Sequence, residues 1–366
     1  PHMRRGIGVD AAKGLDTIVN VSEFESYARA SMAKPTFDFI AGGAEDEVTL
    51  RANREAFSRL RLAPRILSGV ETPRLATTVL GQPVSMPVLV APMGLHQLAH
   101  PEGECASASA ARQAGTVFSL GVAASVAMEA VAGRAGPWWF QTYLLRDRGL
   151  SFDLIRRAEA AGAGAIVLTV DVAVRGRRES DMRNRFEMPP GMTMPNLLPL
   201  DFRGDPPSYS KLTQWDPAIT WKDLDWLAAS TRLPVAVKGV LRADDARKAV
   251  GHGAAALCVS NHGGRQLDGA PAAIEALPAI AEAVGGSAEI ILDGGVRRGS
   301  DVVKALALGA RAVMVGRPIL YGLAFAGEAG ASAVLEMLRA ELATAMILCG
   351  IGDVAEIARD AVTLAS

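Results

Sequence analysis

The chain has 366 residues, of which 49% are hydrophobic, and its formal net charge at neutral pH is −1. This length predicts one large globular domain or two ordinary ones, and the near-zero charge gives no electrostatic argument for a nucleic-acid or membrane partner. Cys105, Cys258 and Cys349 are far apart and lack metal-ligand spacing, so we expect buried thiols in a reducing cytoplasm and no metal site. No apolar run approaches the ~18 residues of a membrane span.

The first 86 residues differ in pattern from the rest. Residues 1–18 show no clear periodicity, and the first three resemble the remnant of a tag. Apolar residues at helical spacing predict a helix over 21–33, and an acidic first turn predicts a second helix over 45–60. Residues 61–86, rich in Pro and Thr, indicate short extended pieces. We therefore expect residues 19–86 to form a helical extension packed on the main body.

From residue 87 onward, short apolar runs alternate with Ala-rich helical stretches. The strand candidates are 87–92, 116–120, 138–143, 165–171, 234–238, 254–260, 289–293 and 312–316. The helix candidates are 102–114, 152–161, 243–252, 273–283 and 300–308. Eight such units predict an α/β fold, a (β/α)8 TIM barrel over residues 87–366. A doubly wound sheet is the alternative, but it usually carries a G-x-G-x-x-G turn after its first strand, and none occurs here.

Polar groups follow the carboxyl ends of the predicted strands, where barrel active sites lie. They stand beside a few small or apolar residues at the same ends, and the set comprises Ala91, Pro92, Met93, Gly94, Gln141, Tyr143, Thr169, Asp171, Lys238, Ser260, His262, Arg265, Asp293, Gly295, Arg297, Gly316 and Arg317. One such polar residue is more often structural than functional. Polar groups at seven strand ends on one rim, however, need a ligand or water as partners.

Residues 260–269, Ser-Asn-His-Gly-Gly-Arg-Gln-Leu-Asp-Gly, carry the strongest chemical signal. His262 can take a proton near neutral pH, and Arg265 can hold a carboxylate through two parallel hydrogen bonds. A base beside a carboxylate clamp is what proton abstraction from a 2-hydroxy acid requires. A capped turn with a solvated Arg is the alternative for these two residues taken alone.

Two segments at the last strand ends indicate a phosphate site. Residues 293–297 and 316–317 offer glycine-rich backbone and two cations, and the loops at this place commonly bind phosphate in such barrels. Flavin mononucleotide (FMN), with its phosphate tail and redox ring, fits this arrangement. Lys238 would then lie beside the ring and stabilise negative charge on the reduced flavin. Its alternative is a core lysine paired with a carboxylate.

The interval from Asp171 to Pro234 is much longer than the others. We expect residues 176–220, rich in Pro and Met, to form a lid over the active site, with a disordered insertion as the alternative. Residues 327–357 have an apolar helical face and are expected to close the bottom or side of the barrel.

These motifs together resemble the FMN-dependent (S)-2-hydroxy-acid-oxidising family, which includes glycolate oxidase, lactate oxidase and mandelate dehydrogenase. The resemblance covers about residues 20–360 and is most specific at 260–269. The supporting motifs are Ala44-Glu45-Asp46, residues 100–104 (HPEGE), 140–143 (FQTY), 168–171 (LTVD), 176–179 (GRRE), 237–239 (VKG), 292–299 (LDGGVRRG) and 315–318 (VGRP).

The resemblance implies a role for each site residue. His262 would take a proton from the substrate, and Asp171 would stabilise the imidazolium. Arg265, Arg178 and Tyr143 would bind the substrate. The flavin ring would contact Ala91, Pro92, Met93, Gln141, Thr169, Lys238 and Ser260. The ribityl chain and phosphate would contact Asp293, Gly295, Arg297, Gly316 and Arg317.

Four positions depart from the family pattern. Phe39 stands where a Tyr often binds the substrate carboxylate, Gly94 replaces Ala, Gly121 replaces a Ser beside the flavin, and Ala123 replaces a bulky Trp. All four changes remove polar or large groups. We therefore expect a roomier, more apolar pocket that favours aryl or long-chain substrates such as mandelate.

The resemblance further implies oxygen as electron acceptor, hydrogen peroxide as product, and a homo-oligomer, in this family often a tetramer. The alternative for the electron acceptor is a quinone or a protein, which would make the enzyme a soluble dehydrogenase. A separate alternative is a degenerate barrel that binds FMN without catalysis, but the intact His262, Asp171 and Arg265 argue against it. An inosinate-dehydrogenase-like barrel would need a catalytic Cys loop, whereas Cys258 lies inside a predicted strand.

Overall fold

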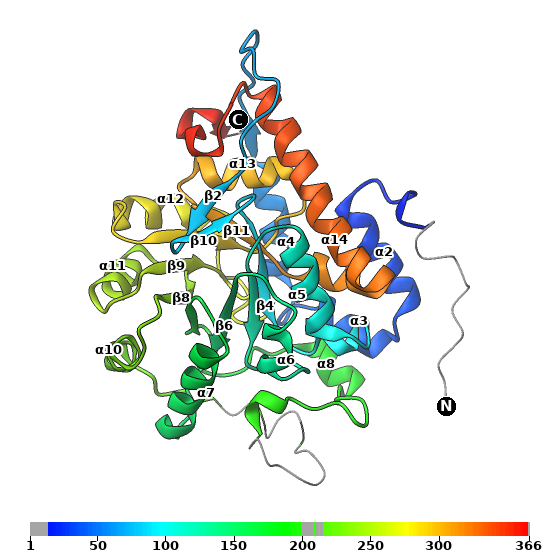
Figure 1. The fold of residues 1–366 in the computed structure, drawn as a ribbon, viewed down its shortest axis with the longest axis vertical. Helices are drawn as coiled ribbons and strands as arrows, with labels where there is room; N and C mark the ends of the chain where they lie inside the picture. Colours follow the sequence, from blue (N-terminus) through cyan, green and yellow to red (C-terminus); the bar gives the residue numbers. More distant parts are fainter. Residues whose placement is uncertain (1–13, 199–207, 209–211, 213–214, 365–366) are drawn as a thin grey trace.

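The computed structural model describes residues 14–198, 208, 212 and 215–364. Its centre is a closed barrel of eight parallel strands (Figure 1). In chain order these are β4 (Val88–Met93), β5 (Phe118–Gly121), β6 (Trp138–Thr142), β7 (Ile166–Thr169), β8 (Val235–Val240), β9 (Ala256–Val259), β10 (Glu289–Asp293) and β11 (Ala312–Val315). Pairing of β11 with β4 closes the barrel.

The predicted (β/α)8 barrel is confirmed, and each predicted apolar run overlaps one barrel strand. Nearly all strand residues are buried, because side chains facing outward meet helices and those facing inward meet each other. Burial on both faces explains why the strands appear in the sequence as continuous apolar runs rather than as alternating patterns.

Helices surround the barrel. They are α5 (Gly103–Gln113), α6 (Met128–Ala132), α7 (Arg148–Ala160), α10 (Trp221–Ser230), α11 (Ala243–Gly251), α12 (Ala273–Val284), α13 (Gly299–Ala307) and α14 (Arg317–Leu348). Five of them match the predicted helices within a few residues. Helix α10 was not predicted. Thr220 and Asp223 form a capping box at its start, and their spacing in the sequence could have indicated the beginning of a helix.

The expected helix over 327–357 is confirmed at its start, where a break in α14 begins a second helical segment, and is wrong at its end. Helix α14 begins at Arg317, where Pro318 suits the first turn, and ends at Leu348. Non-helical backbone at Ala326 and Gly327 divides it, and Gly327 has φ of 58°. The helix packs against α2, α5 and α13, so it covers the side of the barrel (Figure 1).

The barrel is preceded by helices α2 (Val21–Ser31), α3 (Lys34–Ala41) and α4 (Val48–Ser58). The expected acidic first turn of the second helix is wrong, because Glu45, Asp46 and Glu47 lie before α4. Glu45 and Glu47 adopt positive φ, and the Glu47 carboxylate accepts a hydrogen bond from the Gly43 backbone at 2.8 Å. These acids therefore shape the turn that leads into α4 instead of opening the helix.

Two pairs of short strands lie outside the barrel. Strand β1 (Leu60–Leu62) pairs with β12 (Val362–Leu364), and β2 (Thr77–Val79) pairs with β3 (Gln82–Val84). The loop between β1 and β2 projects at the top of Figure 1, with Ile66 and Leu67 exposed. The remaining elements are the 3-10 turns η1 (His96–Leu98), η2 (Pro195–Leu197), η3 (Val354–Glu356) and η4 (Arg359–Ala361) and helix α8 (Glu179–Asn184).

Part of the expected lid falls on residues 199–207, 209–211 and 213–214, which lie outside the described residues. The rest of 176–220 includes α8 and η2. Among the described residues, no helix has the length and apolar character needed to cross a membrane.

Candidate active site

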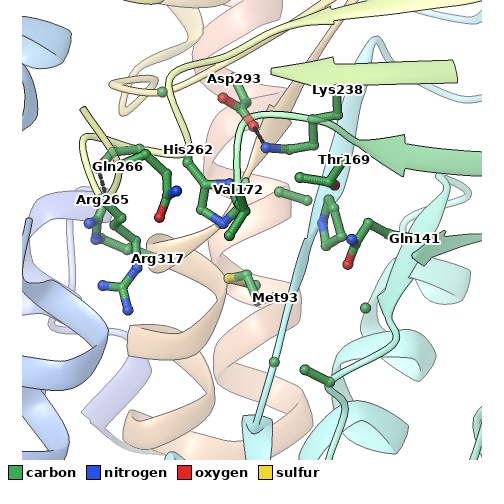
Figure 2. A pocket seen from close by; sticks show the side chains of 18 of the residues that line it. Met93, Gln141, Thr169, Val172, Lys238, His262, Arg265, Gln266, Asp293 and Arg317 are labelled. Atoms are coloured by element: carbon green, nitrogen blue, oxygen red, sulfur yellow. Dashed lines mark hydrogen bonds and ion pairs between the residues drawn. The ribbon is translucent and has the colours of Figure 1, made fainter. Parts of the chain in front are cut away.

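The carboxyl ends of the barrel strands surround a cavity of about 610 Å³, which we call the main cavity (Figure 2). It is lined by every predicted site residue except Asp171 and Ser260. Those two lie directly behind lining residues. Ser260 accepts a hydrogen bond from Lys238 Nζ at 2.9 Å, and Asp171 contacts His262. The structure thus brings the whole predicted set together at one end of the barrel.

His262 and Asp171 form a partly buried pair. The Nδ1 atom of His262 lies 2.9 Å from Asp171 Oδ1, and the His262 backbone N–H donates to Ser260 Oγ at 3.0 Å. Because Asp171 is an acceptor, we assign the imidazole hydrogen to Nδ1, which leaves Nε2 able to accept a proton. His262 itself adopts φ of 58°, in the left-handed region, which fixes the direction of its side chain.

The protonation states of this pair suit a general base. Burial lowers the pKa of His262 below its ordinary value, and the facing carboxylate of Asp171 only partly offsets this effect. Burial acts to raise the pKa of Asp171, but His262 and Lys238 together hold it below its ordinary value. Near neutral pH the pair is therefore a neutral imidazole beside a carboxylate.

Lys238 is buried on β8 and ion-paired with Asp293 of β10, with 3.0 Å between Nζ and Oδ2 (Figure 2). Burial would lower its pKa, but Asp293 and Asp171 outweigh that effect and raise the pKa of Lys238, so the amine stays charged. The pairing with a carboxylate is the one expected of a core lysine. Lys238 nevertheless lines the main cavity.

Two guanidinium groups meet at the other end of the cavity (Figure 2). Arg265 Nη1 donates to the Gly42 carbonyl at 2.8 Å, and Arg317 Nη2 donates to the same oxygen at 2.9 Å. Arg317 also donates to the carbonyls of Ile40 at 3.0 Å and Gly263 at 2.9 Å. The cation expected for the substrate carboxylate and one of those expected for phosphate are therefore neighbours.

Arg297 adds a third cation among the cavity-lining residues after β10 and β11. It is partly buried, and desolvation together with the nearby Arg54 and Arg317 lowers its pKa to about 10. An anion bound beside Arg297 would stabilise its charged guanidinium group. The attraction between the two charges would offset the desolvation and the repulsion that lower the pKa of Arg297.

Orphaned polar atoms show that the cavity is built for a ligand. Gln141 Nε2 and Asp293 Oδ1 are buried, and neither has a hydrogen-bond partner among the described residues. Leaving a buried polar atom unpaired costs about 1–3 kcal/mol. Gln141, Thr169 and Lys238 lie on the adjacent strands β6, β7 and β8. A row of amide, hydroxyl and ammonium groups matches the alternating carbonyl and N–H edge of a flavin pyrimidine.

Aromatic pairs form the outer walls. Phe39 stacks on Phe186 with 4.0 Å between ring centroids, and Tyr143 stacks on Trp215 with 4.3 Å. The guanidinium carbon of Arg265 lies 5.4 Å from the centre of the Phe39 ring. Phe39, Tyr143 and Trp215 line the main cavity. This part of the main cavity is thus walled by aromatic rings and has a guanidinium group beside them.

Two of the four expected enlargements of the pocket are corrected by the structure. A Cβ atom on Gly94 would lie 2.8 Å from the Ala123 carbonyl oxygen, and one on Gly121 would lie 3.0 Å from the Met93 carbonyl oxygen. Neighbouring backbone already fills the space that the missing side chains leave. Glycine at these positions allows the segments after β4 and β5 to approach closely, and only Phe39 and Ala123 are left to support the apolar, roomier pocket.

Sequence reasoning missed several lining residues. They are Ile40, Leu95, Arg146, Val172, Ala173, Val174, Arg175, Trp215, Pro217, Gly263, Gln266, Gly294, Val296, Met314, Val315 and Leu320. Gln266 belongs to the recognised 260–269 stretch, and its amide donates to the carbonyls of Asp171 at 2.9 Å and Val174 at 2.8 Å. The place of Gln266 in the site could therefore have been predicted from this stretch. Trp215 and Arg175 lie in irregular segments where no periodic pattern reveals which way a side chain points.

A (β/α)8 barrel with a base–carboxylate pair, a buried lysine and a cationic end is the arrangement expected of a flavin-binding oxidoreductase. The FMN-dependent dehydrogenase family matches residues 28–364. The chain is 48% identical over 355 residues to L-lactate oxidase of Nostoc sp., covering 94% of this chain and 97% of that one. It is 49% identical over 352 residues to glycolate oxidase 1 of Zea mays, covering 94% and 95%.

Among solved structures, mandelate oxidase with benzoyl-formic acid superimposes with a TM-score of 0.88 at 44% identity, covering 95% of this chain and 99% of the other. The chain belongs to the FMN-dependent dehydrogenase family. It is an FMN-dependent enzyme that oxidises 2-hydroxy acids.

Proposed function

We propose that this enzyme is a 2-hydroxy-acid oxidase that reduces oxygen to hydrogen peroxide and prefers aryl or long-chain (S)-2-hydroxy acids such as mandelate. The observation that carries the proposal is the His262–Asp171 pair, which shares one cavity with Arg265 and with aromatic walls. The names of the relatives, L-lactate oxidase, glycolate oxidase and mandelate oxidase, support oxygen over a quinone or protein as acceptor.

The residues of the chain bind and deprotonate the substrate. Arg265 and Arg178 bind the α-carboxylate, and Tyr143 donates a hydrogen bond to the hydroxyl or carboxylate. This pose turns the hydroxyl-bearing carbon toward His262, whose Nε2 takes one proton. Asp171 stays ionised and stabilises the imidazolium that results. When bound, FMN would supply the acceptor for the two electrons and for the second proton that the 2-hydroxy acid loses in becoming a 2-oxo acid.

The lining residues divide into two groups that would hold the cofactor. The ring would be held by Ala91, Pro92, Met93, Gly94, Gly121, Gln141, Thr169, Lys238 and Ser260, and the ribityl chain and phosphate by Asp293, Gly295, Arg297, Gly316 and Arg317. Phe39, Ala123, Tyr143 and Trp215 contact the substrate side chain. Of the described residues in the expected lid, Arg178, Trp215 and Pro217 line the main cavity. Burying an aryl group against such walls stabilises the complex by about 25 cal/mol per Å² of apolar surface.

Anaerobic reduction followed by oxygen tests the proposal. The purified yellow enzyme is mixed without oxygen with (S)-mandelate, 2-hydroxyoctanoate or glycolate, and flavin bleaching is followed at about 450 nm. We expect bleaching by all three, a higher kcat/KM for the two bulky acids, and one peroxide per flavin when oxygen is readmitted. A higher kcat/KM for glycolate would refute the aryl preference. Slow reoxidation by oxygen with fast reoxidation by a quinone would establish the dehydrogenase alternative instead.

Location and assembly belong to the same proposal. Cys105, Cys258 and Cys349 are free thiols, which suits a reducing cytoplasm. The family resemblance supports a homo-oligomer, namely a tetramer. Light scattering during size-exclusion chromatography measures the mass directly, and a monomeric mass near 38.3 kDa would refute the oligomer.

A further inference from the structure

A second hollow of about 570 Å³ lies on the segment that follows β7. Arg175 and Arg178 line both this hollow and the main cavity, so the two spaces meet at these side chains. Four arginines line the second hollow, whereas Asp181 and Glu187 are its only carboxylates among the described residues. The wall between the two spaces is therefore positively charged.

The main cavity has more cations than its proposed ligands use. Seven cationic side chains line it, and Asp293 is the one carboxylate among its described lining residues. Lys238, Arg297 and Arg317 serve the cofactor, whose phosphate monoester carries about two negative charges. Arg265 and Arg178 serve the α-carboxylate of the substrate. Arg146 and Arg175 have no role in that scheme, and of these two only Arg175 also lines the second hollow.

Arg175 is placed to receive an anion from either space. Its Nη2 lies 2.9 Å from Asp181 Oδ2, and Nη1 of Arg178 lies 3.6 Å from the same oxygen, so one carboxylate oxygen faces two guanidinium groups. The side chain of Arg175 is 39% exposed, whereas that of Arg178 is 9% exposed. Arg175 is therefore accessible to a ligand carboxylate. That carboxylate and Asp181 would share the positive charges of Arg175 and Arg178.

Arg175 is close to the catalytic base along the chain. Asp171, which contacts His262, is four residues before Arg175, so the backbones of Asp171 and Arg175 are at most ~14 Å apart. Val172 and Val174, which also line the main cavity, lie between them. The cavity wall between Asp171 and Arg175 thus offers an apolar strip to the body of a substrate whose α-carboxylate is held at Arg265.

We propose that Arg175 is a specificity-determining residue that binds a second, distal carboxylate on the substrate. The preferred substrates are then 2-hydroxy acids that carry a carboxylate at the far end of an apolar or aryl body. This inference rests on the proposed oxidation of 2-hydroxy acids and narrows its substrate class.

A matched pair of substrates isolates the distal charge. (S)-4-Carboxymandelate and its 4-carboxamide have nearly the same size and differ by one negative charge. We expect the wild-type enzyme to favour the carboxylate by roughly fivefold in kcat/KM, as befits a partly exposed ion pair. Arg175→Leu should bring the ratio to about one, and Arg175→Lys should keep part of it. Arg177→Leu is the matched control, because Arg177 lines only the second hollow, and it should leave the ratio unchanged.

Binding without turnover gives a second readout. 4-Carboxyphenylacetate and 4-carbamoylphenylacetate lack the oxidisable hydroxyl, and their dissociation constants follow from the change in flavin absorbance on titration. The carboxylate should bind more tightly to the wild type and lose that advantage in Arg175→Leu. A wild-type ratio near one, or an equal loss for both members of a pair in Arg175→Leu, would overturn the inference while mandelate still reduces the flavin. Failure of every 2-hydroxy acid to reduce the flavin would instead refute the proposed function, and the inference with it.

Discussion

Gly239 leaves the space that the side chain of Asp171 occupies. A Cβ atom on Gly239 would lie 2.6 Å from Asp171 Cβ and 2.7 Å from its Cγ. Gly239 adopts φ of 110°, and the pairing of β8 with β9 shifts register between Lys238 and Val240. This irregularity directs Lys238 into the cavity while Asp171 rests against His262, so one glycine positions two of the charged groups of the site.

Gly239→Ala should therefore impair catalysis beyond its cost in stability. The added methyl group must displace Asp171, and we expect the rate of flavin reduction to fall by ~10²-fold as the base loses its oriented partner. Gly162→Ala is the control, because Gly162 also has positive φ, 86°, but a Cβ there meets no atom within 4 Å. Both variants should lose about 1 kcal/mol or more of unfolding free energy from backbone strain. Equal rates of flavin reduction in the two variants would contradict the positioning role.

The pH profile of Asp171→Asn should separate two effects of this carboxylate. Burial lowers the pKa of His262, and Asp171 partly restores it, so the wild-type acid limb of kcat/KM should have its midpoint below the ordinary value of about 6.5. Removing the carboxylate removes the raising influence, so the midpoint should move to lower pH. The plateau should drop by ~10²–10³-fold, because the imidazolium is no longer stabilised. A midpoint that moves to higher pH would show that another group titrates.

The Lys238–Asp293 pair should respond differently in stability and in rate. Lys238→Met leaves Asp293 buried without its cation and should cost ~3–5 kcal/mol of unfolding free energy. Adding Asp293→Asn removes the stranded charge and should recover most of that loss. Flavin reduction should remain slowed by at least ~10²-fold in both variants, because the cation beside the ring is absent from both. Urea denaturation and stopped-flow absorbance measure the two quantities separately.

Ala123→Trp should narrow the substrate range. Ala123 lines the main cavity, and an indole there would occupy the volume that an aryl substituent needs. We expect kcat/KM for mandelate to fall at least about tenfold, the loss of roughly 1.4 kcal/mol of binding, while glycolate changes little. Equal losses for the two substrates would place the aryl group elsewhere in the cavity.

Glu104 should be required for the shape of the segments after β4 and β5. Its buried carboxylate accepts hydrogen bonds from the backbone of His96 at 3.0 Å and of Ser125 at 2.8 Å, and from Ser125 Oγ at 2.7 Å. Glu104→Ala strands these donors and should lower the unfolding free energy by about 3 kcal/mol. Glu104→Gln keeps one acceptor and should lose less, as thermal unfolding will show.

The barrel strands and the polar residues at their carboxyl ends were the features best predicted from the sequence. Strands enclosed on both faces appear as continuous apolar runs, and a parallel barrel brings their carboxyl ends together, which gathers residues as distant as Gln141 and Arg317. Positions set by irregular segments were not predictable, as Trp215 and Arg175 illustrate. A sequence also shows that Gly94 lacks a side chain but not that the Ala123 carbonyl fills the vacant space.

The carbonyls of Ile40 and Gly42, which hold Arg265 and Arg317, belong to a segment more than two hundred positions earlier in the chain. The anion-binding end therefore exists only after the first helices have docked, a contact with high loop-closure cost. A refolding chain should regain its far-ultraviolet ellipticity before it regains the capacity to quench FMN fluorescence. The delay between the two signals would measure how slowly residues 21–59 dock on the barrel, and not how slowly the barrel itself closes.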